Sequence, residues 1–105
     1  MLKSRKMLIF SIFLIYYWRR AALKIYDYNG RKNLCGNRVR EARQKQRLSR
    51  SDLAARLQIA GIILERDSVS RIESGTRFVA DYELKVLAQV LKVDLAWLLE
   101  DPAEY

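Results

Sequence analysis

Basic side chains are the residues in this sequence with the clearest chemistry to offer. Between residues 34 and 50, six arginines and lysines stand against one acid, Glu41. Guanidinium and ammonium groups at this density attract phosphate, so one interpretation is a basic face for a nucleic-acid backbone. The alternative is a solvated helix with scattered arginines. The six are Arg38, Arg40, Arg43, Lys45, Arg47 and Arg50.

The sequence contains few residues of the types that commonly carry out catalysis. The chain has no histidine and one cysteine, Cys35. Histidine is the commonest general base and metal ligand, and one cysteine forms no internal disulfide, redox pair or cysteine-rich zinc site. Ser–His and Cys–His hydrolases are therefore excluded, and we expect no enzyme, no metal and no cofactor. For Cys35 a redox switch is one interpretation, and a small unreactive side chain is the plainer one.

Charge divides the 105 residues unevenly, around a net charge of +8. Residues 1–33 hold eight basic residues against one acid, whereas residues 81–105 hold two against six acids. Half of the sequence is hydrophobic, which is ordinary for a globular chain of this length. We expect one domain at residues 34–105, preceded by a hydrophobic and basic extension at residues 1–33.

The extension contains an apolar run at residues 7–18 with basic residues on both sides. As a helix it would span roughly 18 Å, which is short against a hydrocarbon core of about 30 Å. A secretory signal is a second interpretation, but no small-residue cleavage site follows the run. Residues 1–25 could instead associate with anionic lipid at the membrane surface. A further hypothesis is that translation starts at Leu34 and residues 1–33 are not made.

The remaining chain has the composition of an all-α domain, because it is poor in glycine and proline and rich in helix-forming residues. Ser49 and Asp52 form a near-capping-box pattern, and Gly61 and Gly75 are placed to end helices. Asp94 is a capping residue for the last helix. The patterns predict five helices, at residues 36–47, 50–59, 66–73, 81–91 and about 95–99.

The string from Val69 to Arg77 carries a family resemblance. It reads Val-Ser-Arg-Ile-Glu-x-Gly-x-Arg, and it is preceded by Leu48-Ser and Leu53-Ala and followed by Tyr82-Glu-Leu-x-x-Leu-Ala. With these motifs the stretch 36–100 resembles the XRE family, the lambda-repressor-like helix-turn-helix domains of phage repressors and Cro proteins. The sequence departs from the family pattern around residues 61–64, where extra residues make the connection between Leu53 and Val69 longer than usual. We expect it to form a longer helix or an added turn.

The resemblance implies a sequence-specific DNA-binding transcriptional regulator, a repressor, that reads the major groove with the helix at residues 66–73. Arg43 and Glu73 match the family's ion pair; the alternative is an exposed bridge that contributes about 0–1 kcal/mol. Asp67 has an alternative role as a helix N-cap. The implied base-reading residues are Arg66, Asp67, Ser70 and Arg71, and the implied phosphate contacts are Arg43, Arg50 and Arg77.

The implied partners are double-stranded DNA and a second copy of the chain, with no domain for a small-molecule effector. The expected location is the cytoplasm, at the nucleoid. Two other functions stay open. The chain could be an antitoxin or phage accessory factor whose own acidic C-terminal end binds a partner protein, or it could be a membrane-tethered regulator. The candidate dimer contacts are Leu95, Trp97, Leu98 and Leu99, which could equally close the core.

Overall fold

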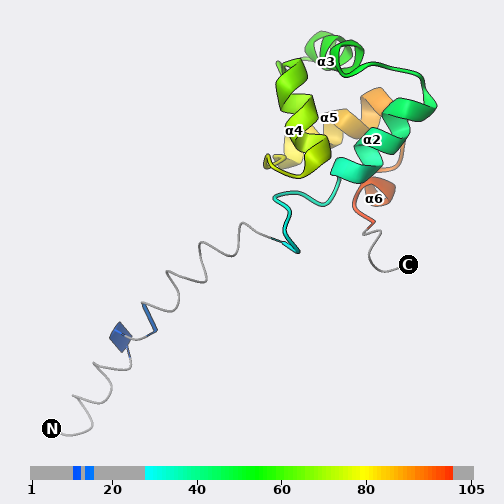
Figure 1. Ribbon diagram of the computed structural model, residues 1–105. Helices are drawn as coiled ribbons and strands as arrows, with labels where there is room; N and C mark the ends of the chain where they lie inside the picture. The colour runs from blue at the N-terminus through cyan, green and yellow to red at the C-terminus, as the bar shows by residue number, and fades with distance from the viewer. Residues whose placement is uncertain (1–10, 13, 16–27, 101–105) are drawn as a thin grey trace, which may run out of the picture.

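The domain is built from short helices around one core (Figure 1). The computed structural model describes residues 11–12, 14–15 and 28–100. Over these residues the regular elements are all helices, which confirms the all-α expectation. They are α2 (Gly36–Lys45), α3 (Arg50–Ile59), α4 (Arg66–Ser74), α5 (Asp81–Leu91) and α6 (Leu95–Leu98).

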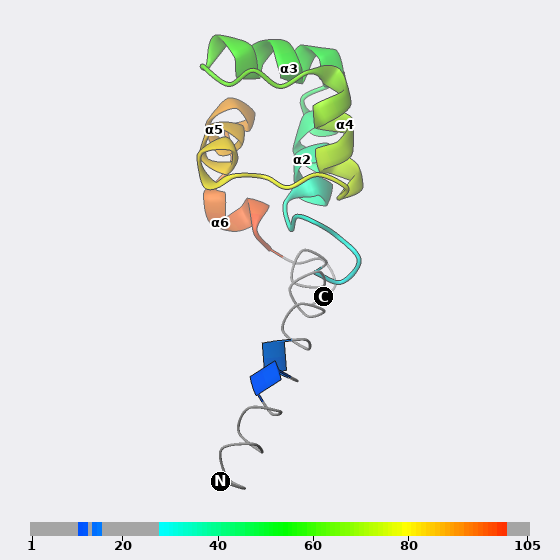
Figure 2. The same cartoon turned by 90° about the vertical axis from the view of Figure 1, so that its left-hand side faces the viewer.

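The apolar stripes of these helices meet in one hydrophobic core. α2 and α4 lie side by side, α3 crosses one end of them, and α5 with α6 closes the opposite side (Figure 2). Each helix presents its apolar residues to that centre at helical spacing, as in α5, where Leu87, Ala88 and Leu91 are buried. The fully buried side chains are Cys35, Val39, Leu53, Leu57, Val69, Ile72, Leu87, Leu91 and Leu98.

Local capping sets both boundaries of α3. The Ser49 hydroxyl accepts a hydrogen bond from the Asp52 N–H at 2.9 Å, and an Asp52 carboxylate oxygen accepts one from the Ser49 N–H at 3.0 Å. This confirms the capping box at the start of α3. At the other end, Gly61 has φ +101, and the N–H of Ile62 reaches back to the Leu57 carbonyl. That left-handed turn ends α3 at Ile59, as the sequence predicts.

The long connection between α3 and α4 contains a turn and then extended chain. After Gly61, residues 62–65 have no regular secondary structure, and the segment runs back beside α3 before entering α4 (Figure 2). α3 itself has 10 residues, so the alternative of a longer helix is wrong. The Leu64 side chain is buried in the core and holds the segment in place.

Residues 28–33 pack against the domain although the sequence assigns them to the extension. Tyr28 and Arg31 exchange backbone hydrogen bonds around a two-residue turn, and the Lys32 N–H donates to the Gly75 carbonyl at 2.7 Å. The Asn33 side chain donates to the Ile72 and Arg77 carbonyls at 3.0 and 2.7 Å. Residues 28–33 are therefore held against the helical domain by these hydrogen bonds. We call residues 28–33 the N-terminal strap.

Most of the extension lies outside the described residues, and so do the predictions about membrane association of residues 1–25, a signal sequence and the start of translation. Ahead of the N-terminal strap, the described residues are 11–12 and 14–15, which are helical and exposed. Among the helices of the described residues, none has the length and apolar character to cross a bilayer.

Cys35 is a core residue at the start of α2. Its side chain is buried, and burial raises the pKa of the thiol to about 11. Because the thiolate is the reactive form, a thiol with this pKa has little reactivity near neutral pH. Its buried position therefore supports the plainer interpretation of Cys35.

Candidate nucleic-acid interface

α4 separates its residues cleanly into a buried side and an exposed side. Val69, Ile72 and Glu73 face the interior, and the side chains of Arg66 and Asp67 are 63% and 77% exposed. Arg71, one turn further on, is exposed as well, and Ser70 is half-buried. All four predicted base-reading residues thus lie on one helix, with their three charged groups in solvent.

Asp67 does not cap α4. The helix begins at Arg66, so the N-cap position falls on Glu65, whose side chain makes no capping hydrogen bond. Asp67 lies inside the first turn, 3.9 Å from a guanidinium nitrogen of Arg66. The N-cap alternative for Asp67 is therefore wrong. Its carboxylate still complements the positive end of the helix dipole.

Glu73 is the centre of a buried ion pair. Arg43 Nε donates to Glu73 Oε2 at 2.7 Å, and Arg43 Nη2 donates to Glu73 Oε1 at 3.0 Å. The third nitrogen, Nη1, donates to the Leu48 carbonyl at 2.8 Å. Both side chains are under a tenth exposed, so the alternative of an exposed bridge is wrong. The pair joins α2 to α4 and fixes the orientation of the exposed side of α4.

The same geometry argues against Arg43 as a phosphate contact. Each of its guanidinium nitrogens is already hydrogen-bonded to Glu73 or Leu48, and the residue is 8% exposed. An arginine held in this way positions its neighbours but does not reach a DNA backbone. The prediction of a phosphate contact at Arg43 is therefore corrected to a positioning role.

Two other arginines surround Glu73 from the solvent side. Arg50 Nε lies 3.2 Å from Glu73 Oε1, and Arg40 Nε lies 3.9 Å from the same oxygen. Their side chains are 29% and 52% exposed. Three guanidinium groups around one carboxylate leave an excess of positive charge where α2, α3 and α4 meet. Arg40 belongs to the basic segment of the sequence but was not among the predicted site residues; its spacing of three residues from Arg43 on one helix was the available signal.

Arg77 is engaged in a second ion pair, with Glu83 of α5. Its two terminal nitrogens each donate to one Glu83 carboxylate oxygen at 3.1 Å, and one of them also donates to the Phe78 carbonyl. Glu83 in turn accepts from the Ala80 N–H at 2.9 Å. Arg77 therefore holds the loop between α4 and α5, and this contact competes with the predicted phosphate role. The sequence analysis did not single out Glu83.

The pKa of Glu83 records this contact. Burial alone would raise the pKa of the carboxyl, but the hydrogen bonds from Arg77 and Ala80 and the charge of Arg77 outweigh it and lower the pKa below its ordinary value.

A Glu83→Gln variant should lose about 1–2 kcal/mol of unfolding free energy at pH 7 because it gives up a charge-assisted pair. The lowered pKa in the folded state means that this contribution is present above pH 4.5 and disappears as the pH falls through the folded-state pKa. Urea unfolding of both proteins at a series of pH values measures the effect, and the two curves should converge in acid. Glu65→Gln, at an exposed carboxylate that makes no capping hydrogen bond, is the matched control. Parallel curves for wild type and Glu83→Gln down to pH 3 would contradict the assignment.

The predicted dimer contacts near the C-terminus divide into different groups. Leu98 is fully buried in the core, so its assignment as a dimer contact is wrong. Trp97 is half-buried, with the Arg38 guanidinium 4.7 Å from its ring centre. Leu95 and Leu99 are 45% and 41% exposed and remain available to a second chain.

The acidic C-terminal end is described only as far as Glu100, which pairs with Arg38 at 3.0 Å. Residues 101–105 lie outside the described part of the chain.

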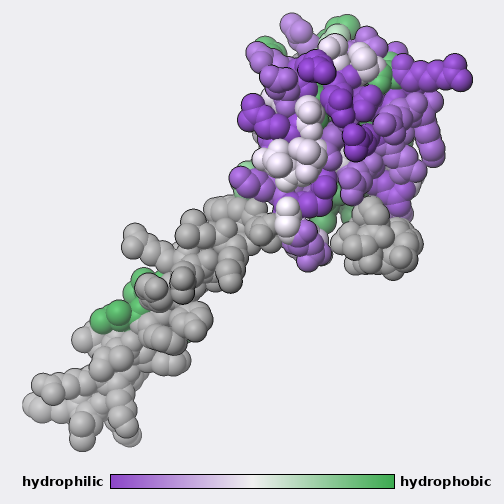
Figure 3. Space-filling model, in the orientation of Figure 1, coloured by the Kyte–Doolittle hydropathy of each residue, from purple (hydrophilic) through white to green (hydrophobic). Residues whose placement is uncertain are grey.

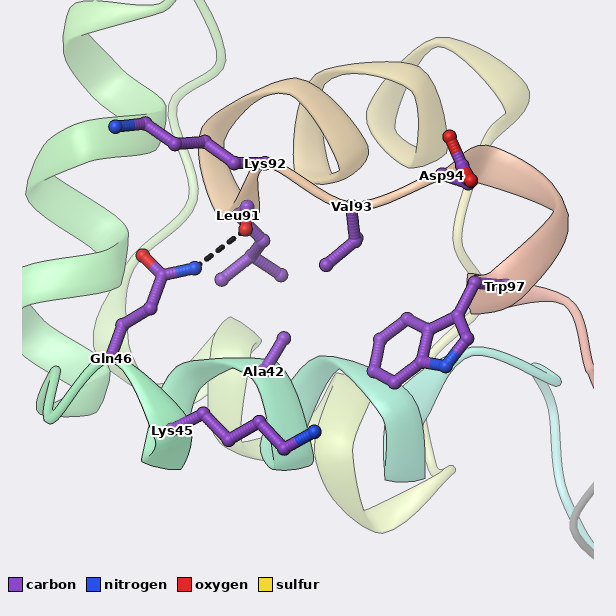
Figure 4. Close-up of a pocket in the computed structure, with 8 residues that line it drawn as sticks. All are labelled: Ala42, Lys45, Gln46, Leu91, Lys92, Val93, Asp94 and Trp97. Atoms are coloured by element: carbon purple, nitrogen blue, oxygen red, sulfur yellow. Dashed lines mark hydrogen bonds between the residues drawn. The ribbon is translucent and has the colours of Figure 1, made fainter.

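A hollow of about 660 Å³ lies away from α4 (Figure 4). Its walls come from α2, the end of α5, α6 and the residues between them. The Gln46 side chain bridges two of these walls by donating to the Leu91 carbonyl. Because no part of α4 lines it, the hollow is separate from the candidate interface. The lining residues are Ala42, Lys45, Gln46, Leu91, Lys92, Val93, Asp94 and Trp97.

These features together define a helix-turn-helix protein: α3 and α4 are the two helices of the motif, and α4 exposes a charged face. Comparison with protein families agrees, since the helix-turn-helix domain model matches residues 35–98. The chain belongs to this family, which is of the XRE and Cro-like helix-turn-helix type. No curated protein and no solved structure matches the chain.

Proposed function

We propose that this chain is a transcriptional repressor that reads a specific DNA sequence with α4 in the major groove. The observation that carries the proposal is the exposed set of Arg66, Asp67 and Arg71 on a helix whose opposite side is anchored by the buried Arg43–Glu73 pair. Arg can bond guanine O6 and N7 with two N–H groups, and Asp can accept from cytosine N4. A rigidly held helix presents these groups at fixed spacing, which sequence discrimination requires.

Contacts to the DNA backbone would come from Arg40 and Arg50. Both lie beside Glu73 and retain exposed surface, and Arg50 begins α3, where the helix dipole also favours a phosphate. Figure 3 shows that the described domain surface in this view is predominantly hydrophilic. These contacts would orient the domain without reading sequence.

Repression would follow from occupancy: a bound domain blocks polymerase at the same DNA. We further propose that two copies bind two half-sites, with Leu95 and Leu99 at the contact between them, since helix-turn-helix domains commonly bind DNA in symmetric pairs. The protein would act at the nucleoid in the cytoplasm, as a binding protein and not as an enzyme, without a cofactor or an effector.

The test is selection of preferred duplexes from a randomised library by the full chain, followed by titration of those duplexes. Arg71→Ala should weaken binding to the preferred duplex by about 5- to 100-fold, because one bidentate arginine–guanine contact is lost. Binding to scrambled DNA should change little. Arg56→Ala removes an exposed arginine from the last turn of α3 and is the charge-matched control.

Salt dependence separates the two roles that an arginine can have. If Arg71→Ala weakens binding to preferred and scrambled duplexes equally and lowers the salt slope, then Arg71 contacts phosphate and the base-reading assignment fails. If the wild-type chain enriches no sequence, the proposed function itself is contradicted.

A further inference from the structure

In the connection between α3 and α4, the apolar side chain of Ile63 is exposed to solvent between two residues that face the core. Ile62 packs partly against the core, Ile63 is 81% exposed, and Leu64 is 7% exposed. This alternation is that of an extended chain, in which successive side chains point to opposite sides. Because Leu64 and Ile62 anchor the segment inward, Ile63 is fixed facing outward.

Ile63 lies close to the start of the helix that is proposed to enter the major groove. Arg66 is three positions further along the chain, and an extended chain advances about 3.3 Å per residue, so the two Cα atoms are at most about 10 Å apart. Base pairs follow one another every 3.4 Å or so. The distance between Ile63 and Arg66 therefore corresponds to at most about three base-pair steps. If Arg66 contacts one base pair of a duplex, Ile63 lies within about three base pairs of it.

The chemistry of Ile63 complements that of α4. The exposed charged groups of α4 are guanidinium and carboxylate groups, which suit guanine and cytosine. Thymine is the base that presents an apolar group in the major groove, its 5-methyl. An exposed isoleucine covers such a methyl and removes apolar surface of both from water.

From this placement we infer that Ile63 packs against the 5-methyl group of a thymine beside the bases read by α4. The extra residues of the connection then form a second reading element and make Ile63 a specificity-determining residue. The inference rests on the proposed function, because it requires α4 to lie in the major groove.

The experiment removes the methyl group from either side of the contact. Each thymine of a duplex selected by the full chain is replaced, one at a time, by deoxyuridine, which lacks only the 5-methyl. The base pair read by Arg66 is the one whose preference is lost in Arg66→Ala. Within about three base pairs of it, one deoxyuridine replacement should weaken wild-type binding about three- to fivefold. In Ile63→Ala the unsubstituted duplex should bind weaker by a similar factor, and the deoxyuridine replacement should have no further effect.

Ile59→Ala is the matched control. Ile59 is 88% exposed at the opposite end of the same connection, and this variant should keep the full sensitivity to deoxyuridine. If the chain selects a sequence but no thymine responds, or if the response persists in Ile63→Ala, the inference is overturned while the proposed function stands. If the chain selects no sequence, both fall.

Discussion

Replacing Glu73 with alanine is expected to lower the free energy of unfolding by about 3–5 kcal/mol. The reason is the partner left behind: Arg43 is 8% exposed, and two of its guanidinium nitrogens bond to Glu73. Without the carboxylate, a buried positive charge keeps only the Leu48 carbonyl as a partner. Urea unfolding followed by circular dichroism measures the change.

Glu65→Ala is the control for this substitution, because Glu65 lies at the start of the same helix, is exposed and makes no capping hydrogen bond. It should change the unfolding free energy by less than about 0.5 kcal/mol. Arg43→Ala should destabilise as strongly as Glu73→Ala, and the double variant should lose less than the sum of the two single losses. A loss below about 1 kcal/mol in Glu73→Ala would show that the pair is dispensable.

A chain beginning at residue 34 should be about 2–4 kcal/mol less stable than one beginning at residue 28. The N-terminal strap is what differs between them. Arg31 Nη2 donates to the Glu73 carbonyl at 3.0 Å, Asn33 donates to two further carbonyls, and the Asn33 side-chain oxygen accepts from the Gly36 N–H at 2.8 Å. The cost of ordering the strap offsets part of these bonds, which is why the expected loss is less than their sum.

Single substitutions locate the effect within the strap. Asn33→Ala should lose about half of the difference, since three of the hydrogen bonds involve this side chain. Lys32→Ala should cost less than about 1 kcal/mol, because the bond to the Gly75 carbonyl comes from the Lys32 backbone and remains. Equal thermal unfolding of the chains starting at residues 28 and 34 would contradict a structural role for the strap.

Both predictions concern the C-terminal half of α4. The strap binds the carbonyls of Ile72, Glu73 and Gly75, and the Glu73 side chain is held by Arg43. Gly75 permits this arrangement: it has φ +79, and a Cβ there would lie 2.6 Å from the Arg31 guanidinium carbon. The helix is thus fixed at its far end, and its first turn with Arg66 and Asp67 is left exposed.

The helices of this domain were predictable from sequence because their signals are local. The start of α3 depends on Ser49 and Asp52, three residues apart, and its end depends on Gly61. The buried stripe of α5 follows from the spacing of its leucines. Such signals act within one or two turns of helix, so a reading of neighbouring residues recovers them. The first residue of α4 was placed correctly, yet the capping role of Asp67 was not, since Glu65 occupies that position.

Which arginines are paired and which are exposed was decided by tertiary structure. Arg43, Arg66, Arg71 and Arg77 carry the same guanidinium group, and the sequence proposed DNA contacts for all of them. Two meet carboxylates brought from elsewhere in the chain, Arg43 across 30 residues to Glu73 and Arg77 across a loop to Glu83, and two remain in solvent on α4. The sequence by itself determined the helices, the family and the helix that is proposed to face DNA. Which charges that helix can offer was decided by the packing of α2, α4 and α5, because a buried pair forms only where distant segments meet.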